Sequence, residues 1–148
     1  MGNRAVITRS KDLKGVGIYL HWNGGRDSVE AFLAYCNLKG YRGYDEEYGM
    51  AMLVNVMTNF FEEGLSCGIG IAEKMDCDNH DNGVFFIGDE WNIVGRKFCN
   101  SYQEQLFYDL RKMINSIDEK QPEKMRLTEK EWERFEEVKA KTIAARGV

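Results

Sequence analysis

In Leu20-His21-Trp22-Asn23-Gly24-Gly25-Arg26-Asp27-Ser28-Val29, a predicted strand turns directly into a helix. Before the glycines, residues 15–22 are rich in β-branched and aromatic side chains, which favours a strand. After them, apolar side chains recur at helical spacing, at Val29, Phe32, Leu33 and Cys36. Gly40 then ends the helix. This early strand–turn–helix indicates a protein of mixed α and β structure.

The two glycines of this turn allow the backbone to adopt positive φ and to approach a ligand closely. The first turn of the helix offers unpaired N–H groups at the positive end of the helix dipole. An arginine directly after the glycines adds a fork of donors that suits phosphate. We therefore predict a phosphate-bearing ligand near Trp22, Asn23, Gly24, Gly25 and Arg26. The alternative is a plain tight turn in which Asp27 or Ser28 caps the helix and the arginine is solvated.

The order of the remaining elements predicts the fold class. Strands are expected over residues 4–9, 15–22, 65–71, 84–87 and 91–96, and helices over 28–40, over 49–63, from 101, and from Thr128, where a capping box with Glu131 starts the last helix. This order does not alternate strand and helix, so a doubly wound parallel sheet is not expected. We predict an α+β fold with an antiparallel sheet and two helices packed on it.

The chain of 148 residues is long enough for one domain with a sizeable core. We expect an α+β ligand-binding body over residues 1–100 and a C-terminal helical region over 101–148 that is not an independent domain. The C-terminal helices are amphipathic, so they pack on their own body or on another subunit. We favour the second alternative and expect these helices to mediate oligomerisation.

Composition narrows the function classes. No apolar run approaches the roughly 18 residues of a membrane span, and the N-terminus has no signal-peptide pattern, so we expect a cytoplasmic protein. The four cysteines form no C-x-x-C pair, which suggests reduced thiols. Residues 1–100 carry ten basic and fourteen acidic side chains, so binding of long nucleic acid is not expected. A single small anion remains a suitable ligand.

The last predicted hairpin carries a second candidate site. Alternation along residues 91–96 places Asn92, Val94 and Arg96 on one face of the strand. Together with Phe86, these side chains would offer an aromatic platform, an amide and a guanidinium to an adenine and its phosphate. The alternative is that both Phe85 and Phe86 belong to the core.

No catalytic constellation is evident. Residues 76–83 gather three aspartates and a histidine, but their spacing does not match an EF-hand, so we interpret them as an acidic turn. We find no nucleophilic cysteine signature and no zinc-binding pattern. We therefore expect no metal, no cofactor and no enzymatic activity.

Two family resemblances bear on function. Gly24-Gly25-x-Asp27-Ser28 resembles the nucleotide-binding loop of PP-loop ATP pyrophosphatases, although Asn23 replaces the leading serine and the repeated βα units of that family are missing. A PP-loop-like nucleotide-binding enzyme is therefore one alternative, and a protein that binds a host factor through its C-terminal helices is another.

Most of residues 1–115 resembles the phage-encoded Thoeris anti-defence proteins of the first type. The resemblance lies in Gly2-Asn3-Arg4-Ala5-Val6-Ile7, in Gly17 to Val29, in Asp81-Asn82-Gly83-Val84 and in Ile93-Val94-Gly95-Arg96. It implies a non-enzymatic sponge that sequesters glycocyclic ADP-ribose, the signal made by bacterial TIR enzymes, and so blocks Thoeris signalling. It also implies hexamers assembled from dimers and a second site for cyclic trinucleotides.

The resemblance further implies a ligand pocket with an aromatic ring, an asparagine and arginines, some supplied by the C-terminal helix of a partner. By position, these parts fall to Phe86, Asn92 and Arg111, with Phe85 or Trp91 as alternatives for the ring.

Overall fold

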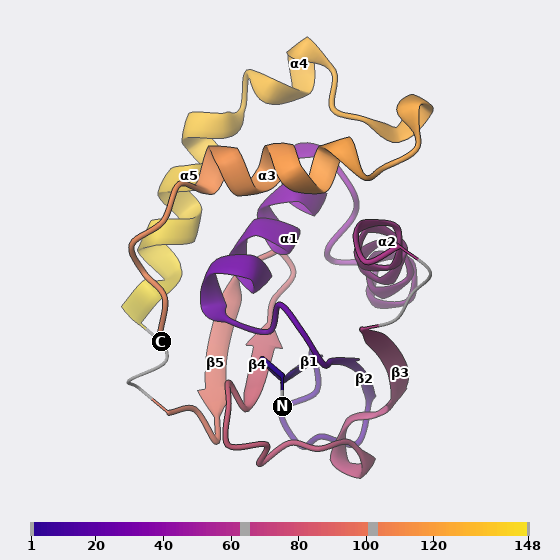
Figure 1. Ribbon diagram of the computed structural model, residues 1–148, viewed down its shortest axis with the longest axis vertical. Helices are drawn as coiled ribbons and strands as arrows, with labels where there is room; N and C mark the ends of the chain where they lie inside the picture. The colour runs from indigo at the N-terminus through magenta and orange to yellow at the C-terminus, as the bar shows by residue number, and fades with distance from the viewer. Residues whose placement is uncertain (1, 63–65, 101–103, 148) are drawn as a thin grey trace.

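The computed structural model describes residues 2–62, 66–100 and 104–147 and has the expected α+β architecture (Figure 1). One sheet contains five strands in the order β3-β2-β1-β4-β5. The strands are β1 (Ala5–Thr8), β2 (Val16–Leu20), β3 (Cys67–Ile71), β4 (Val84–Ile87) and β5 (Ile93–Lys97). The predicted strands are therefore confirmed, and β4 has the predicted bounds. Residue 65, the predicted start of the third strand, lies outside the described residues.

The sheet is mixed rather than purely antiparallel. β1 pairs antiparallel with β2, but it pairs parallel with β4, with Val6 opposite Val84. The reason is topological, because β3 joins the β2 edge of the sheet and the chain then returns on the other side of β1. A parallel neighbour requires such a crossover instead of a hairpin.

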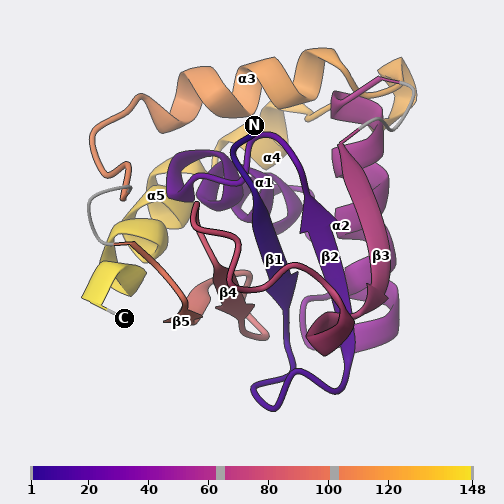
Figure 2. The ribbon, with the colours of Figure 1, turned by 60° about the horizontal axis from the view of Figure 1, so that its bottom comes forward.

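The helices gather on one side of the sheet (Figure 2). There, α1 (Arg26–Leu38) and α2 (Glu46–Phe60) join the main hydrophobic core, which includes Ile7, Leu20 and Phe85 of the strands. α2 begins three residues earlier than predicted, because the Asp45 side chain accepts a hydrogen bond from the Tyr48 N–H and caps the helix.

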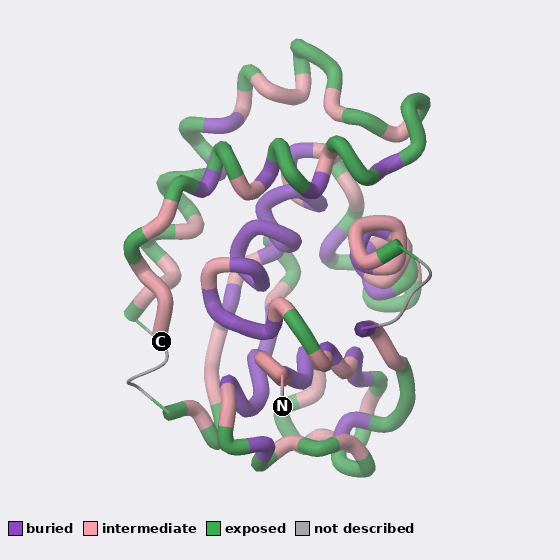
Figure 3. The backbone as a smooth tube through the Cα atoms, in the orientation of Figure 1, coloured by how far each residue is buried: buried purple, intermediate pink, exposed green. Residues whose placement is uncertain are grey.

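α1 is the central element of the molecule. Eleven of its thirteen residues are buried, including Arg26 and Glu30, and Figure 3 shows the burial continuing along the helix. A helix buried on all sides needs partners on its outer face as well as the sheet beneath it. Those partners are the C-terminal helices.

A smaller apolar cluster covers the opposite face of the sheet. Val6, Val84 and Phe86 pack there with Ala72, the first residue of the short 3-10 helix η1 (Ala72–Lys74). Phe86 is therefore a core residue on the far side of the sheet from α1.

The C-terminal region consists of α3 (Leu110–Glu119), the 3-10 turn η3 (Glu123–Met125), α4 (Glu129–Trp132), α5 (Phe135–Ala144) and η4 (Ala145–Gly147). The predicted helical start at residue 101 is wrong for residues 104–109, which precede α3 without helical structure, while residues 101–103 lie outside the described part. The Asp109 side chain accepts from the Lys112 N–H and starts the helix there. The predicted capping box of Thr128 and Glu131 is confirmed.

The apolar stripes of this region pack on the same chain. Ile114 and Ile117 of α3, and Phe135 and Val138 of α5, belong to the main core, and both helices contact α1 (Figure 1). Packing on its own body thus accounts for these stripes. Oligomerisation by the C-terminal helices stays a prediction.

Within the described residues, no helix is long and apolar enough to cross a membrane.

Candidate functional site

The turn before α1 is held in place by contacts with β1 and with the residues that lead into β1. The Gly24 N–H donates to the Asn3 carbonyl at 2.7 Å, and a Cβ on Gly24 would lie 2.5 Å from that oxygen. Asn23 adopts a left-handed φ of 58°, and its side-chain amide donates to the Ser28 hydroxyl. Trp22 is about half exposed, at 51%. The first glycine is thus required by the close approach of two backbone segments.

The first N–H groups of α1 already have acceptors from the protein itself. The Arg26 N–H donates to the Gln105 side-chain oxygen at 3.0 Å, and the Ser28 N–H donates to the Asp27 carboxylate at 2.7 Å. An acidic side chain in the first turn also suits the helix dipole. These are the donors that a phosphate would need at this turn.

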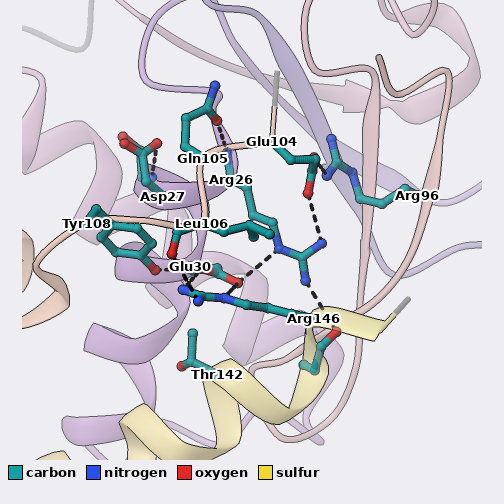
Figure 4. A network of polar contacts seen from close by, with 12 residues as sticks. Arg26, Asp27, Glu30, Arg96, Glu104, Gln105, Leu106, Tyr108, Thr142 and Arg146 are labelled. Atoms are coloured by element: carbon teal, nitrogen blue, oxygen red, sulfur yellow. Dashed lines mark hydrogen bonds and ion pairs between the residues drawn. The ribbon is translucent and has the colours of Figure 1, made fainter. Parts of the chain in front are cut away.

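The Arg26 side chain is buried and lies among carboxylates (Figure 4). Its Nε donates to Glu30 at 3.0 Å, Nη1 donates to Glu104 at 3.1 Å, and Nη2 donates to the Ala145 carbonyl at 3.2 Å. The guanidinium therefore ties α1 to the 104–109 segment and to the C-terminal end of the chain. Arg26 is therefore not solvated, so this part of the plain-turn alternative is wrong.

Glu30 is the second centre of this network. Its carboxylate also accepts two hydrogen bonds from Arg146, at 3.0 and 3.2 Å, and one from the Tyr108 hydroxyl at 2.5 Å. Burial, the bond to Glu30 and its charge together raise the pKa of Tyr108, while the bond to Glu30 raises the pKa of Arg146. Tyr108 therefore stays a neutral donor and Arg146 stays charged.

Arg96 joins the network from β5. It forms an ion pair with Glu104, and its guanidinium lies over the Phe85 ring, 3.7 Å from the ring centroid. Burial alone would raise the pKa of Glu104, but the charge of Arg96 and the hydrogen bonds from Arg96, Cys99 and Arg26 outweigh it and lower that pKa. Glu104 is thus a carboxylate at neutral pH.

A bulge changes the predicted faces of β5. Phe86 pairs with Gly95 and Ile87 pairs with Ile93, so Val94 is an extra residue and the alternation is interrupted. Val94 then packs with Phe86, while Arg96 lies opposite Phe85 on the helical side. The predicted grouping of Val94 with Arg96 is wrong for this reason, and Phe86 and Arg96 lie on opposite faces of the sheet.

Arg111 lies on α3 and has partners within the chain. Its guanidinium is 4.5 Å from the centroid of the Trp132 ring and 5.2 Å from that of Phe135. These cation–π contacts fasten α3 to the end of α4 and the start of α5. The structure therefore does not bring Arg111 together with Phe86 and Asn92 in one chain.

A groove of about 360 Å³ lies beside the hairpin between β4 and β5. Aromatic and cationic side chains face it, and they are Tyr41, Tyr44, Trp91, Arg42, Arg134 and Lys141. Tyr44 is 70% exposed, whereas Trp91 is buried and donates through its indole N–H to the Tyr41 carbonyl at 2.8 Å. We name this hollow the Trp91 groove.

Arg9 joins the two walls of the Trp91 groove. It donates to the Gly43 carbonyl of one wall and forms an ion pair with Asp89 of the other. A Cβ on Gly43 would lie 2.3 Å from the Asp89 carbonyl oxygen, so a glycine is required where the loop meets the hairpin. The groove is therefore built on anchored backbone.

The cations of the groove differ in how they are neutralised. Arg134 donates to the carbonyl and the side-chain oxygen of Asn37, at 2.9 and 2.8 Å, and both acceptors are uncharged. Lys141 is about half exposed and lies 3.8 Å from Glu137, a surface pair of little energy. Glu90 also lines the groove, so its potential is mixed rather than uniformly positive.

Asn92 lies beside this groove. It lines a neighbouring hollow of about 240 Å³ that shares Glu90 and Lys141 with the Trp91 groove. Trp91, one of the predicted alternatives for the aromatic ring, lines the Trp91 groove, and Asn92 lines the hollow beside it. Neither Arg96 nor Arg111 lines either hollow, so the predicted ligand pocket stays a prediction. The Gly/Tyr-rich composition of the loop from Gly40 to Tyr48 was the signal that could have pointed to this wall.

The four thiols are held protonated, and two carboxylates of the predicted acidic turn are paired. Burial raises the pKa of the Cys67 thiol to about 11 and also raises the pKa of Cys36, Cys77 and Cys99. In the predicted acidic turn, Asp76 and Asp81 pair with Arg4. Across residues 2–62, 66–100 and 104–147, no three potential ligand side chains lie together in a way that could hold a metal ion.

Fold and groove together define an α+β protein with an aromatic and cationic surface hollow. No family model, no curated protein and no solved structure matches the chain.

Proposed function

We propose that this chain is a non-enzymatic phage anti-defence protein that binds and sequesters glycocyclic ADP-ribose and so blocks Thoeris-type signalling. The observation that carries the proposal is the Trp91 groove, with Asn92 in the hollow beside it. Exposed aromatic rings stack on a base, and arginine and lysine bind phosphate. The sequence resemblance names the cyclic nucleotide, and the groove offers the chemistry that such a ligand needs.

Holding rather than converting the ligand is favoured by the state of the candidate nucleophiles. A thiol attacks as the thiolate, and the raised pKa values keep the four cysteines protonated at neutral pH. The protein would act in the cytoplasm of the infected bacterium, as a homo-oligomer.

The test is to titrate the full chain with purified glycocyclic ADP-ribose by calorimetry, then wash, heat-denature and identify the released nucleotide. Binding followed by release of unaltered ligand supports sequestration. A protein that binds nothing, or that returns an altered nucleotide, refutes it.

Variants tested in the same binding experiment show whether the ligand occupies the Trp91 groove. Tyr44→Ala and Lys141→Gln should each weaken binding about tenfold, since stacking on a base and a hydrogen bond to a charged group are each worth about 1–3 kcal/mol. Lys139→Gln is the matched control, because Lys139 is exposed on the same helix and lies outside both hollows. Unchanged binding in both groove variants would exclude the Trp91 groove while leaving sequestration intact.

A further inference from the structure

A hollow of about 210 Å³ lies between α1, α2 and α3, three helices that contact one another in pairs (Figure 1). It shares no lining residue with the Trp91 groove. Protein interiors contain few voids larger than a water molecule, so a space of this size beside the core is a candidate for a guest molecule.

The walls of this hollow are mainly apolar. They are formed by Phe32 of α1, Phe60 of α2, and Met113 and Ile117 of α3. The Phe32 and Phe60 rings meet edge to face, with their centroids 5.4 Å apart and their planes at 82°. A further ring packs favourably on such a pair, and a thioether also makes a favourable contact with an aromatic ring. A cavity of about 150 Å³ with apolar walls holds benzene, so the size of the hollow suits a single substituted ring.

One side of the hollow is polar. It is lined by Asn23, from the turn before α1, and by Ser28, from the first turn of α1. The Asn23 amide donates to the Ser28 hydroxyl at 3.3 Å, but within the described residues that hydroxyl donates to no acceptor. Ser28 is only 6% exposed, so its O–H is a buried donor without a partner in the protein. Ser116 also lines the hollow, but its hydroxyl already donates to the Lys112 carbonyl.

No charged side chain lines the hollow among the described residues. A phosphate or a carboxylate would lose its hydration there without gaining a cation, which is costly. A nucleotide is also larger than the space. The hollow therefore differs in chemistry from the cyclic-trinucleotide site that the sequence resemblance implies.

We propose that this hollow binds a small, neutral aromatic molecule that carries one hydroxyl group. The ring of the guest packs on Phe32 and Phe60. Its hydroxyl oxygen accepts from Ser28, and its hydroxyl hydrogen is donated to the side-chain oxygen of Asn23. Ser116 is exposed on α3, so the guest enters beside it. p-Cresol has this size and chemistry. Such binding goes beyond nucleotide sequestration and does not depend on it.

The test is calorimetric titration of the full chain with p-cresol, toluene and 4-methylbenzoate. p-Cresol should bind with a Kd of about 1 mM or tighter, and its ring protons should show NOEs to the Met113 methyl group. It should bind at least as tightly as toluene, because a hydroxyl group is tolerated in an apolar hollow only where it finds hydrogen-bond partners. The charged 4-methylbenzoate should not bind.

Three variants locate the guest, each checked for folding by circular dichroism. Ser28→Ala removes the donor and should weaken p-cresol about tenfold while leaving toluene unchanged. Ser116→Arg fills the entrance and should abolish binding of both probes. Asn115→Arg is the matched control, because Asn115 is the exposed neighbour of Ser116 on α3 and lies outside the hollow.

The proposal is overturned if p-cresol does not bind, if 4-methylbenzoate binds equally well, or if Ser116→Arg behaves like Asn115→Arg. Equal loss of p-cresol and toluene in Ser28→Ala would also overturn it, because the hydroxyl group would then have no specific partner. Tyr44→Ala, in the Trp91 groove, should bind p-cresol normally, so this site and the nucleotide site are tested independently.

Discussion

Replacing Glu30 by glutamine should destabilise the protein more than any exchange of a surface carboxylate. Glu30 is 3% exposed and accepts hydrogen bonds from Arg26, Arg146 and Tyr108 (Figure 4). The glutamine keeps the volume and one acceptor oxygen, but it removes the negative charge between two guanidinium groups. Arg26 would keep its ion pair with Glu104 but lose the one with Glu30.

The magnitude follows from the burial of the pair. Removing one partner of a buried ion pair costs about 3–5 kcal/mol, and the retained acceptor places Glu30→Gln near the lower end, at about 3 kcal/mol. That is a large part of the roughly 5–15 kcal/mol by which a domain of this kind is stable. With a urea dependence of about 2 kcal/mol per molar, the unfolding midpoint should fall by about 1.5 M.

The assay is urea unfolding at neutral pH followed by circular dichroism. The control is Glu62→Gln, which makes the same chemical change in an exposed ion pair with Lys120 at 2.6 Å and should leave the midpoint almost unchanged. If Glu30→Gln shifts the midpoint no further than this control, the network does not hold the C-terminal segment on α1 and the reasoning is wrong.

Two further predictions concern the same region. The pKa of Glu104 is lowered in the folded state, so its ionised form stabilises the fold above the ordinary carboxyl range and this contribution disappears as the pH falls through the lowered value. Glu104→Gln should therefore be less stable than the wild type at pH 6, with the difference shrinking toward about pH 3, and an equal difference at both pH values in urea unfolding would contradict this. Gly24→Ala should lose about 1–3 kcal/mol, because its Cβ would meet the Asn3 carbonyl at 2.5 Å, whereas Gly147→Ala, with nothing within 4 Å, should not change the melting temperature.

The local elements of this fold could be predicted because their causes lie within a few residues. Gly83 has a φ of +66° just before β4, and Gly40 has a φ of +74° just after α1, as a turn and a helix end require. The capping box of Thr128 needs only Glu131, three residues further on. Periodicity likewise identified α1, because Val29, Phe32 and Cys36 recur at helical spacing within the helix itself.

The candidate site was predicted only in part, because its cations come from distant parts of the chain. Trp91 and Asn92 could be named from one hairpin. Arg134 and Lys141 lie more than forty residues further along the chain, and nothing in their own surroundings in the sequence marks them. Their place beside Trp91 depends on how α5 packs on α1.

The glycine turn of residues 24–28 shows which features the local sequence determines and which depend on tertiary contacts. The sequence by itself determined that a strand ends there, that a helix begins and that an arginine follows the glycines, since turn and helix preferences act locally. Glu30 lies four residues further along the same helix, but only the tertiary structure decided the other partners of that arginine, because Glu104 and Ala145 lie 78 and 119 residues away. In the same way, one extra residue in β5 decided the face of Arg96, since strand alternation holds only while the pairing is regular. The chemistry of a side chain can be read from the sequence, but its contact partner depends on the packing of segments that lie far apart along the chain.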